Sequence, residues 1–397
     1  MVTITAAILA SLSISVLALE AFECRYSGHP GLSTSLASYA LQKVLQDASP
    51  VFGDYVNGHS STATWMRNYP DSTQLVHMNL PGTHDAQTGN YSAATQQSLE
   101  HVTNLNGVFL PPSQYLRCQD KSLVDMLNAG IRVFDLRFAF DATNTTLVFY
   151  HGPALQSETA TVDDVLYGYY QWLDDHPSEA ILLSFNYEGS TKKYASNNAA
   201  VQLQIFKALT SPAARKYFVQ TKGEFGTLGA ARGKITLLRR FAMPDLPASY
   251  SDALPGIFFS AGLWTDNSPA ITLTYNPQQN LTAYIEDFYN IGSPIGSGAA
   301  LNIQWKYNAT TANIIKATTT HPNSLFWSFA SNEYTFDNPP ETPMIMAVGN
   351  GSQITPMGGV NQRLVPFLKQ QKGKRVGIIM FDFFDIPGEL VETMLSL

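Results

Sequence analysis

The sequence predicts an α/β protein in which a parallel β-sheet closes into a barrel, and three observations support this expectation. Strand-like apolar runs alternate with helical patterns, as they do in parallel sheets. No Gly-x-Gly-x-x-Gly turn follows the first predicted strand, and polar residues gather at the strand ends, which favours a closed barrel over an open Rossmann sheet. The predicted strands span residues 75–80, 131–138, 147–150, 180–185, 234–241, 325–329 and 376–383.

Composition limits the classes of protein to which this chain can be assigned. Its 397 residues suffice for one large α/β domain or two ordinary ones, and with 45% hydrophobic and 14% charged residues a sizeable core is expected. The net charge is −7, and the 24 Lys and Arg residues are scattered along the chain. A nucleic-acid ligand is therefore not expected, because binding a polyanion requires a basic surface.

The first residues of the chain have the pattern of a secretory signal peptide. Residues 4–19 are uncharged and mostly apolar, and the run ends before Glu20 with small residues at Ala18 and Ala21. The alternative is a membrane anchor, but the run is shorter than the roughly 20 residues that a span needs. We predict a signal peptide at residues 1–21, an N-terminal extension at 22–62, a barrel domain at 63–397, and secretion.

Two further patterns bear on an extracellular location. Asn-x-Ser/Thr sequons compatible with a secreted glycoprotein begin at Asn90, Asn144, Asn280, Asn308 and Asn350. Cys24 and Cys118 are the only cysteines, and in an oxidising compartment they are able to form one disulfide. A metal site built from several cysteines is excluded by this count.

Titratable residues are predicted to meet at the carboxyl ends of the strands. His84 and Asp85 follow the first predicted strand and a Pro-Gly pair that reads as a turn. On the second strand, alternation with period two places Asp135 and Arg137 on the face of the apolar residues at 131 and 133. These charged residues are therefore expected to point into the barrel.

The same alternation places a second histidine and a further carboxylate in this group. His151 shares a face with the apolar residues at 147 and 149, and Asp382 shares one with those at 376, 378 and 380. Asp135 and Arg137 have an alternative interpretation as a structural salt bridge in the barrel floor. Two histidines with carboxylates and an arginine are, however, the groups needed for acid–base phosphoryl transfer without a metal.

Three motifs occur in order and at suitable spacing: Leu-Pro-Gly-Thr-His-Asp at residues 80–85, Phe-Asp-Leu-Arg at 134–137 and His-Gly-Pro at 151–153. Together they resemble the X-region of phosphatidylinositol-specific phospholipase C, and most of all its single-domain bacterial branch. The similarity extends over residues 63–395. It implies an α/β fold, a distorted and incompletely closed TIM (β/α)8 barrel, with the active site at the carboxyl ends of the strands.

The resemblance also implies roles for six catalytic residues. His84 would be the general base for the inositol 2-hydroxyl, with Asp382 as its orienting carboxylate. Arg137 would stabilise the phosphate, and Asp135 would fix Arg137. The general acid for the diacylglycerol oxygen and its supporting carboxylate would be His151 and Asp85. The products would be diacylglycerol and inositol 1,2-cyclic phosphate.

Four further residues would bind the substrate by the same resemblance. Arg240 and Asp287 would hold inositol hydroxyls, and Tyr289 would stack on the sugar ring. Asn186 stands where the bacterial pattern has a lysine and the calcium-dependent pattern a glutamate, so it can donate a hydrogen bond but carries no charge. Weaker activity or different substrate contacts are expected from this departure.

The resemblance predicts a mechanism that uses no metal and no cofactor. Arg137 stands where calcium-dependent relatives have an acidic residue, and its guanidinium would take the place of the cation. Asp85 fits the same branch, because calcium-dependent members have Asn there. The expected partner is a phosphoinositide lipid at a membrane surface, with no obligate protein partner.

Two other functions remain open from the sequence. A catalytically quiet barrel that binds inositol lipids or glycans is favoured by Asn186 and opposed by the intact pair of histidines. A related phosphodiesterase acting on another head group would need additional acidic metal ligands, and Arg137 stands where one would be wanted.

Overall fold

The computed structural model describes residues 35–103, 109–188, 197–291, 295–349, 351 and 358–397. Two compact units are distinguished, Met1–Lys43 and Val44–Leu397. In the first unit the described residues are Ser35 and the opening turns of helix α2 (Leu36–Phe52), where the Ser35 hydroxyl lies 3.1 Å from that of Ser38. The predicted signal peptide and Cys24 lie outside the described residues, and the predicted boundaries at 21 and 62 stay predictions.

The second unit is built on a nearly closed barrel of nine strands. The hydrogen-bonded order is β7-β6-β5-β2-β1-β11-β10-β9-β8, so β7 and β8 are the two ends of the path and face an unsealed seam. Pairing is parallel from β7 to β9 and antiparallel between β9 and β8. The strands are β1 (Leu80–Thr83), β2 (Val133–Phe140), β5 (Ala180–Tyr187), β6 (Lys234–Arg239), β7 (Ile257–Phe258), β8 (Ser268–Asn276), β9 (Leu281–Asp287), β10 (Leu325–Phe329) and β11 (Ile378–Phe381). The predicted incompletely closed barrel is confirmed.

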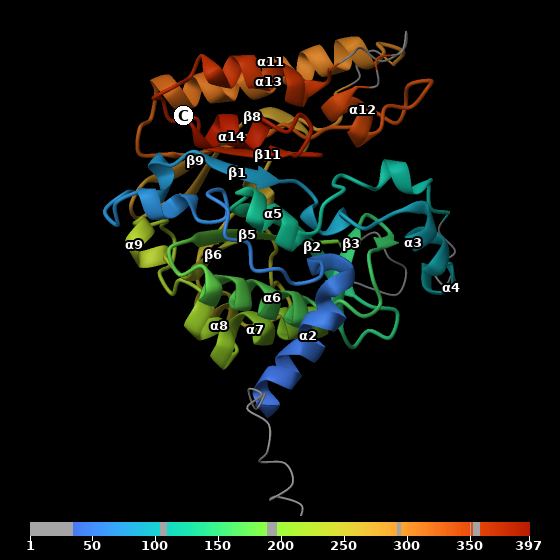
Figure 1. Ribbon diagram of the computed structural model, residues 1–397, viewed down its shortest axis with the longest axis vertical. Helices are drawn as coiled ribbons and strands as arrows, with labels where there is room; N and C mark the ends of the chain where they lie inside the picture. Colours follow the sequence, from blue (N-terminus) through green and yellow to red (C-terminus); the bar gives the residue numbers. More distant parts are fainter. Residues whose placement is uncertain (1–34, 104–108, 189–196, 292–294, 350, 352–357) are drawn as a thin grey trace, which may run out of the picture. The chain divides into compact units, whose positions relative to one another are not determined.

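Helices cover the barrel on opposite sides (Figure 1): α11 and α13 lie on one side and α6, α7 and α8 on the other. Their bounds are α3 (Ala93–Ser98), α4 (Glu100–Thr103), α5 (Leu123–Ala129), α6 (Val162–Asp175), α7 (Ala199–Thr210), α8 (Pro212–Tyr217), α9 (Leu228–Ala231), α10 (Ala248–Ala253), α11 (Ala299–Thr319), α12 (Pro343–Val348), α13 (Val360–Lys369) and α14 (Leu390–Leu395). Within the described parts of the chain, none of the helices combines the length and the apolar character that a membrane span requires.

Alternation along the strands divides the core into two layers. Val133, Leu182 and Met380 belong to a cluster inside the barrel, whereas their neighbours Phe134 and Leu183 belong to the cluster between the barrel and the helices. Both faces of these strands are buried, which is typical of parallel sheets covered by helices. The same alternation carries Asp135 and Arg137 into the interior with Val133, as the sequence predicts.

The first strand differs from the prediction. Residues 75–77 form a short 3-10 helix, η2 (Leu75–His77), and β1 begins only at Leu80, so the Pro-Gly pair is part of the strand and not a turn after it. The reason is close packing, because a Cβ at Gly82 would collide with Met380 and Val133 of the neighbouring strands. His77, which falls within the predicted strand at 75–80, lies in this 3-10 helix and is exposed.

The third predicted strand was also placed wrongly in the barrel. Strand β3 (Leu147–His151) pairs antiparallel with β2 and with the short β4 (Ala154–Leu155), and it lies off the barrel path. Strands β7, β8 and β9 complete the barrel instead and were not predicted. Strand β8 was hard to recognise because only Ile271 and Leu273 of its residues are buried, and β7 spans only two residues.

A buried ion pair lies at the amino-terminal end of the barrel, opposite the predicted site. Arg132 and Glu179 are both fully buried, with Nη2 2.7 Å and Nε 3.1 Å from one carboxylate oxygen. The remaining guanidinium donors reach the carbonyl oxygens of Leu127, Ile131 and Ala63 at 2.8 Å. The pair fastens the turns before β2 and β5 to each other.

Neutralising this carboxylate is expected to destabilise the protein strongly. Glu179→Gln leaves a fully buried guanidinium without its counter-charge, and the free energy of unfolding should fall by about 3–5 kcal/mol. Urea unfolding followed by tryptophan fluorescence measures this loss. Glu389→Gln is the matched control, because Glu389 pairs with Lys369 at 3.0 Å on the surface and should change the free energy by less than about 1 kcal/mol. Equal losses in the two variants would contradict the prediction.

Candidate active site

The loop that follows β1 brings His84 to the carboxyl end of the barrel. Its backbone N–H donates to the carbonyl oxygen of Phe381, the last residue of β11, at 3.1 Å. This places His84 Nδ1 2.9 Å from the Oδ1 of Asp382, which directly follows β11. The carboxylate fixes the orientation of the ring and holds a proton on Nδ1, so that Nε2 faces the other polar groups of the site.

Asp85 is the centre of the cluster. Its backbone adopts the left-handed conformation, with φ of 41°, and its carboxylate is fully buried. Its Oδ1 lies 2.7 Å from Arg137 Nε, while its Oδ2 lies 3.2 Å from Nε2 of His84 and 3.3 Å from Nε2 of His151. Asp85 therefore contacts both histidines, whereas the sequence predicted a contact with His151 alone.

Arg137 is enclosed by carboxylates. Besides Asp85, its guanidinium lies 3.4 Å from Asp135 and 2.9 Å from Glu188, and its Nη2 is 2.8 Å from Nε2 of His84. Burial alone would lower the pKa of Arg137, but the three carboxylates outweigh it and raise the pKa well above its ordinary value. The side chain is thus a permanent positive charge beside the histidine.

The charges around His84 act in opposite directions. Burial disfavours the imidazolium, but the carboxylates of Asp85 and Asp382 outweigh it and raise the pKa of His84 to about 9, with Arg137 opposing them. Burial would raise the pKa of Asp85, yet Arg137, His151 and His84 together hold it well below its usual range. Asp85 is therefore an anion throughout the physiological pH range.

His151 ends β3, and both of its ring nitrogens are engaged. Nδ1 lies 2.8 Å from the carbonyl oxygen of Leu116, so it carries a proton and donates it there. Nε2 faces Asp85 at 3.3 Å.

Two of the predicted substrate-binding residues, Arg240 and Asp287, lie close together at the cavity. Arg240, which follows β6, lies 3.3 Å from Asp135 and 3.7 Å from Asp287 at the end of β9. Its guanidinium stacks on the ring of Trp264 at 4.0 Å from the ring centroid, and the indole N–H of Trp264 donates to Asp287 at 2.7 Å. These contacts fix Arg240 and Asp287 against each other.

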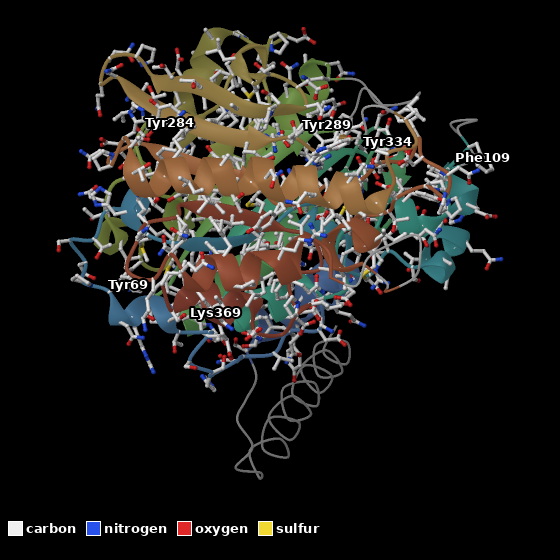
Figure 2. All side chains as sticks on the ribbon, turned by 90° about the horizontal axis from the view of Figure 1, so that it is seen from above. Tyr69, Phe109, Tyr284, Tyr289, Tyr334 and Lys369 are labelled. Carbon is white, nitrogen blue, oxygen red and sulfur yellow. The ribbon has the colours of Figure 1, made fainter. Side chains whose placement is uncertain are left out.

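Tyr289 and Asn186 complete the predicted set. The hydroxyl of Tyr289 donates to Asp266 at 2.9 Å, which orients the ring. Figure 2 shows Tyr289 and Tyr334 on neighbouring segments, which are joined by a hydrogen bond of 2.9 Å from the N–H of Glu333 to the carbonyl oxygen of Tyr289. Asn186 stands beside Arg137 in the β2–β5 register.

A cavity of about 250 Å³ opens at this point. Of the ten predicted site residues, Asp85 and Asp135 are fully buried and do not line the cavity, and the others line it: His84, Arg137, His151, Asn186, Arg240, Asp287, Tyr289 and Asp382. Sequence reasoning missed further lining residues, Trp264, Asp266, Asn332, Glu333 and Pro343, and also Glu188, which pairs with Arg137. Glu188 could have been found, because it follows Asn186 at the period of two that places side chains on one strand face. Trp264, Asp266, Asn332 and Glu333 lie in loops without a pattern, and Pro343 begins helix α12.

Cys118 also lines the cavity, where the sequence suggested only a disulfide partner. It is a buried free thiol in the structure, 3.9 Å from Asp85 and 4.0 Å from His151. Cys24, the partner that the sequence suggested, lies outside the described residues. Burial, together with the charges of Asp382 and Asp85, raises the pKa of this thiol well above its ordinary value.

Two histidines with carboxylate partners flank a buried guanidinium at the carboxyl ends of barrel strands. Such a set can remove a proton on one side of an anionic phosphodiester and supply one on the other. Fold and site together define a barrel phosphodiesterase.

Comparison with known proteins agrees with this class. Residues 109–241 match the family described as phosphatidylinositol-specific phospholipase C, X domain. The chain is 25% identical over 251 residues to a 1-phosphatidylinositol phosphodiesterase of Staphylococcus aureus, covering 60% of this chain and 71% of that protein. It is 30% identical over 178 residues to the enzyme of the same name from Listeria monocytogenes, covering 45% of this chain and 49% of that protein.

A solved structure shares the fold. The F249X mutant of phosphatidylinositol-specific phospholipase C from Staphylococcus aureus superposes with a TM-score of 0.61 at 18% identity, covering 85% of this chain and 97% of that one. These similarities confirm the resemblance predicted from the motifs. The chain thus resembles the phosphatidylinositol-specific phospholipase C X domain over residues 109–241 and shares the barrel fold of the solved enzyme.

Proposed function

We propose that this protein cleaves phosphatidylinositol, or anchors that contain inositol, to diacylglycerol and inositol 1,2-cyclic phosphate. The observation that carries the proposal is the position of Arg137 between His84 and Asp85, at 2.8 and 2.7 Å. An anionic phosphate drawn to this guanidinium would meet a base and an acid on either side. The neighbouring 2-hydroxyl of the inositol is the nucleophile, so proximity is already supplied by the substrate.

On the base side, His84 removes the proton of the 2-hydroxyl. Its Nδ1–H donates to Asp382, which leaves the lone pair of Nε2 to accept the proton. The 2-oxygen then forms a bond to phosphorus, and the imidazolium is stabilised by the carboxylates of Asp382 and Asp85. Arg137 offsets the charge that builds up on the phosphate oxygens.

On the acid side, the bond between phosphorus and the diacylglycerol oxygen breaks. That oxygen takes the proton held between His151 and Asp85, which are 3.3 Å apart, and leaves as an alcohol. The proton gained by His84 and the proton lost on the acid side balance over the reaction. The inositol ring would lie against Tyr289 with its hydroxyls on Arg240 and Asp287.

The reaction is proposed to proceed without a metal. Arg137 has its charge fixed by three carboxylates and stands where a cation would otherwise contact the phosphate. We also propose that the protein is secreted and acts on lipids at a membrane surface, as its predicted signal peptide indicates. Asn186 has its Oδ1 3.0 Å from the N–H of Tyr187, so its amide NH2 is the group that would reach a hydroxyl.

The test is an assay of the purified protein on phosphatidylinositol vesicles with a chelator present. Phosphorus NMR is expected to show inositol 1,2-cyclic phosphate as the first product, together with diacylglycerol. Vesicles of phosphatidylcholine should yield no product. Lipid that is bound but not cleaved would favour the quiet barrel, and a chelator-sensitive reaction would overturn the metal-independent mechanism.

Asp382→Asn is expected to move the acid limb of the pH–rate profile. Removing this carboxylate takes away one of the charges that raise the pKa of His84. The neutral form of His84 then becomes available at lower pH, and the acid limb should move down by roughly one pH unit. The maximal rate should fall by about a hundredfold or more, because a neutral amide does not stabilise the imidazolium and can turn its NH2 group toward Nδ1, which would favour the wrong tautomer. The profile of kcat/KM between pH 5 and 10 measures both effects.

Asp385→Asn is the matched control for that shift. Asp385 lies three residues further along the chain and pairs with Lys121 at 3.3 Å, outside the cavity. Its variant should retain the wild-type profile. An unchanged acid limb in Asp382→Asn would mean that His84 is not the group whose titration limits the rate.

A further inference from the structure

Cys118 converges with catalytic side chains in a way that the proposed reaction does not use. Its Sγ, a carboxylate oxygen of Asp85 and a ring nitrogen of His84 all lie within 4.8 Å of one another. Among the described residues, these three side chains form the cluster of His, Cys, Asp or Glu groups that is compact enough to share a metal ion. The nitrogen of His84 on that side is Nε2, 3.2 Å from Asp85 Oδ2.

The sulfur is held in place by the backbone on both sides. The N–H of Cys118 donates to the hydroxyl of Thr88 at 3.0 Å, and its carbonyl oxygen accepts from the N–H of Phe383 at 2.9 Å. Cys118 is thereby fastened to the loop after β11 and to Thr88, which closely follows the loop after β1 that carries the other two donors. Three donors on fixed segments need little rearrangement to close on one ion.

The donor set selects a class of metal. A thiolate, an imidazole nitrogen and a carboxylate oxygen suit Zn²⁺ and the softer Cd²⁺, with Zn–S of about 2.3 Å and Zn–N of about 2.0 Å. Mg²⁺ and Ca²⁺ prefer sets of oxygen donors. Three protein ligands leave a fourth position open toward the cavity.

Charge also favours a divalent cation here. The carboxylates of Asp85, Asp135 and Glu188 contact Arg137, Asp135 also contacts Arg240, and Asp382 contacts His84, so four carboxylates face two guanidinium groups. An ion at this position would displace Arg137 from His84, but Asp135 and Glu188 remain to hold the guanidinium. Metal binding therefore costs the contact between Arg137 and His84, but it leaves the buried guanidinium paired with carboxylates.

We propose that His84, Asp85 and Cys118 form a binding site for a thiophilic divalent cation, Zn²⁺ or Cd²⁺, which inhibits the enzyme. The ion occupies the lone pair of His84 Nε2 that otherwise takes the proton of the substrate hydroxyl, and it draws Arg137 away from the phosphate position. Binding rests on the cluster of donors alone, whereas inhibition rests on the proposed function. The thiol proton of Cys118 is released to solvent when the metal–sulfur bond forms.

Binding is tested first, without substrate. The purified full chain is titrated with Cd²⁺, and the ultraviolet charge-transfer band of a cadmium thiolate is followed. Wild type and Cys24→Ser, which removes the one other cysteine of the sequence, are expected to show the band. Cys118→Ser is expected to lose it and to bind Zn²⁺ roughly tenfold more weakly in equilibrium dialysis.

Inhibition is tested second, on phosphatidylinositol vesicles. Zn²⁺ should inhibit wild type reversibly, with activity restored by a chelator, while Mg²⁺ at the same concentration should not. Cys118→Ser should be active and need roughly tenfold more Zn²⁺ for half-inhibition. Cys118→Ala and a thermal melt of both variants show whether any change comes from misfolding.

The outcomes separate the two proposals. A cadmium band that persists in Cys118→Ser, or wild-type sensitivity to Zn²⁺ in that variant, would overturn the metal site. A band that depends on Cys118 in a protein without phospholipase activity would support the site and refute the proposed function. Loss of the band in Cys24→Ser would move the thiolate ligand away from the cavity and would also overturn the proposal.

Discussion

His84→Ala is expected to lower the rate of cyclic inositol phosphate formation by about 10⁴-fold. The variant removes the nitrogen that takes the hydroxyl proton, and it leaves the carboxylate of Asp382 without the ring that it contacts at 2.9 Å. Arg137 keeps Asp85, Asp135 and Glu188 as partners. Phosphate binding should therefore be weakened far less than the chemical step, and KM should change little compared with kcat.

The control for this variant is His101→Ala. His101 is exposed and pairs with Glu158 at 3.1 Å on the surface, so its removal should leave the rate unchanged. Both variants are to be assayed at several pH values, because water is a poor substitute base at any of them. If His84→Ala kept more than about a hundredth of the wild-type rate, general-base catalysis by His84 would be refuted.

Arg137→Lys is expected to lower kcat/KM by about 10²–10³-fold while keeping the charge. The guanidinium reaches four neighbours at once: Asp85, Asp135, Glu188 and His84 Nε2. An ammonium group is a compact point charge that cannot span them in a fixed plane. The phosphate would then lose a donor of fixed direction in the transition state, and the three carboxylates would lose the guanidinium that orients them.

Arg215→Lys tests whether any loss is specific to the site. Arg215 is exposed in α8, where its Nε donates to the carbonyl oxygen of Thr210 at 3.1 Å, and the exchange should leave kcat/KM unchanged. A thermal melt should show that Arg137→Lys is folded. Wild-type kcat/KM in Arg137→Lys would mean that charge alone suffices at this position.

The sequence predicted best those features that depend on local alternation. Val133 is buried inside the barrel, and the alternation from it places Asp135 and Arg137 in the interior. The same rule places Asp382 beside the interior Met380. Continuous apolar runs such as residues 180–185 and 325–329 were recognised as strands because both of their faces are buried.

The features that were missed depend on distant contacts. Pro81 and Gly82 lie in a strand, where neighbouring strands pack so closely that only glycine fits at position 82. A rule for turns that uses local sequence alone does not include such packing. Trp264 reaches the site only because β7 and β8 bring its loop next to Arg240. The nearness of Cys118 to Asp85 likewise arises from two loops that are fastened to each other across the barrel mouth.

The unsealed seam of the barrel has a consequence for recognition. Between β7 and β8 no ladder of backbone hydrogen bonds joins the described strands, but the loop that crosses the gap carries Trp264. Its indole lies under Arg240, from the β6 side, and holds Asp287, from the β9 side. Contacts among the side chains of Arg240, Trp264 and Asp287 thus bridge the seam, where backbone pairing stops. Arg240 and Asp287 are also the residues expected to bind the inositol hydroxyls. Binding of the ring and closure of the barrel therefore depend on the same contacts.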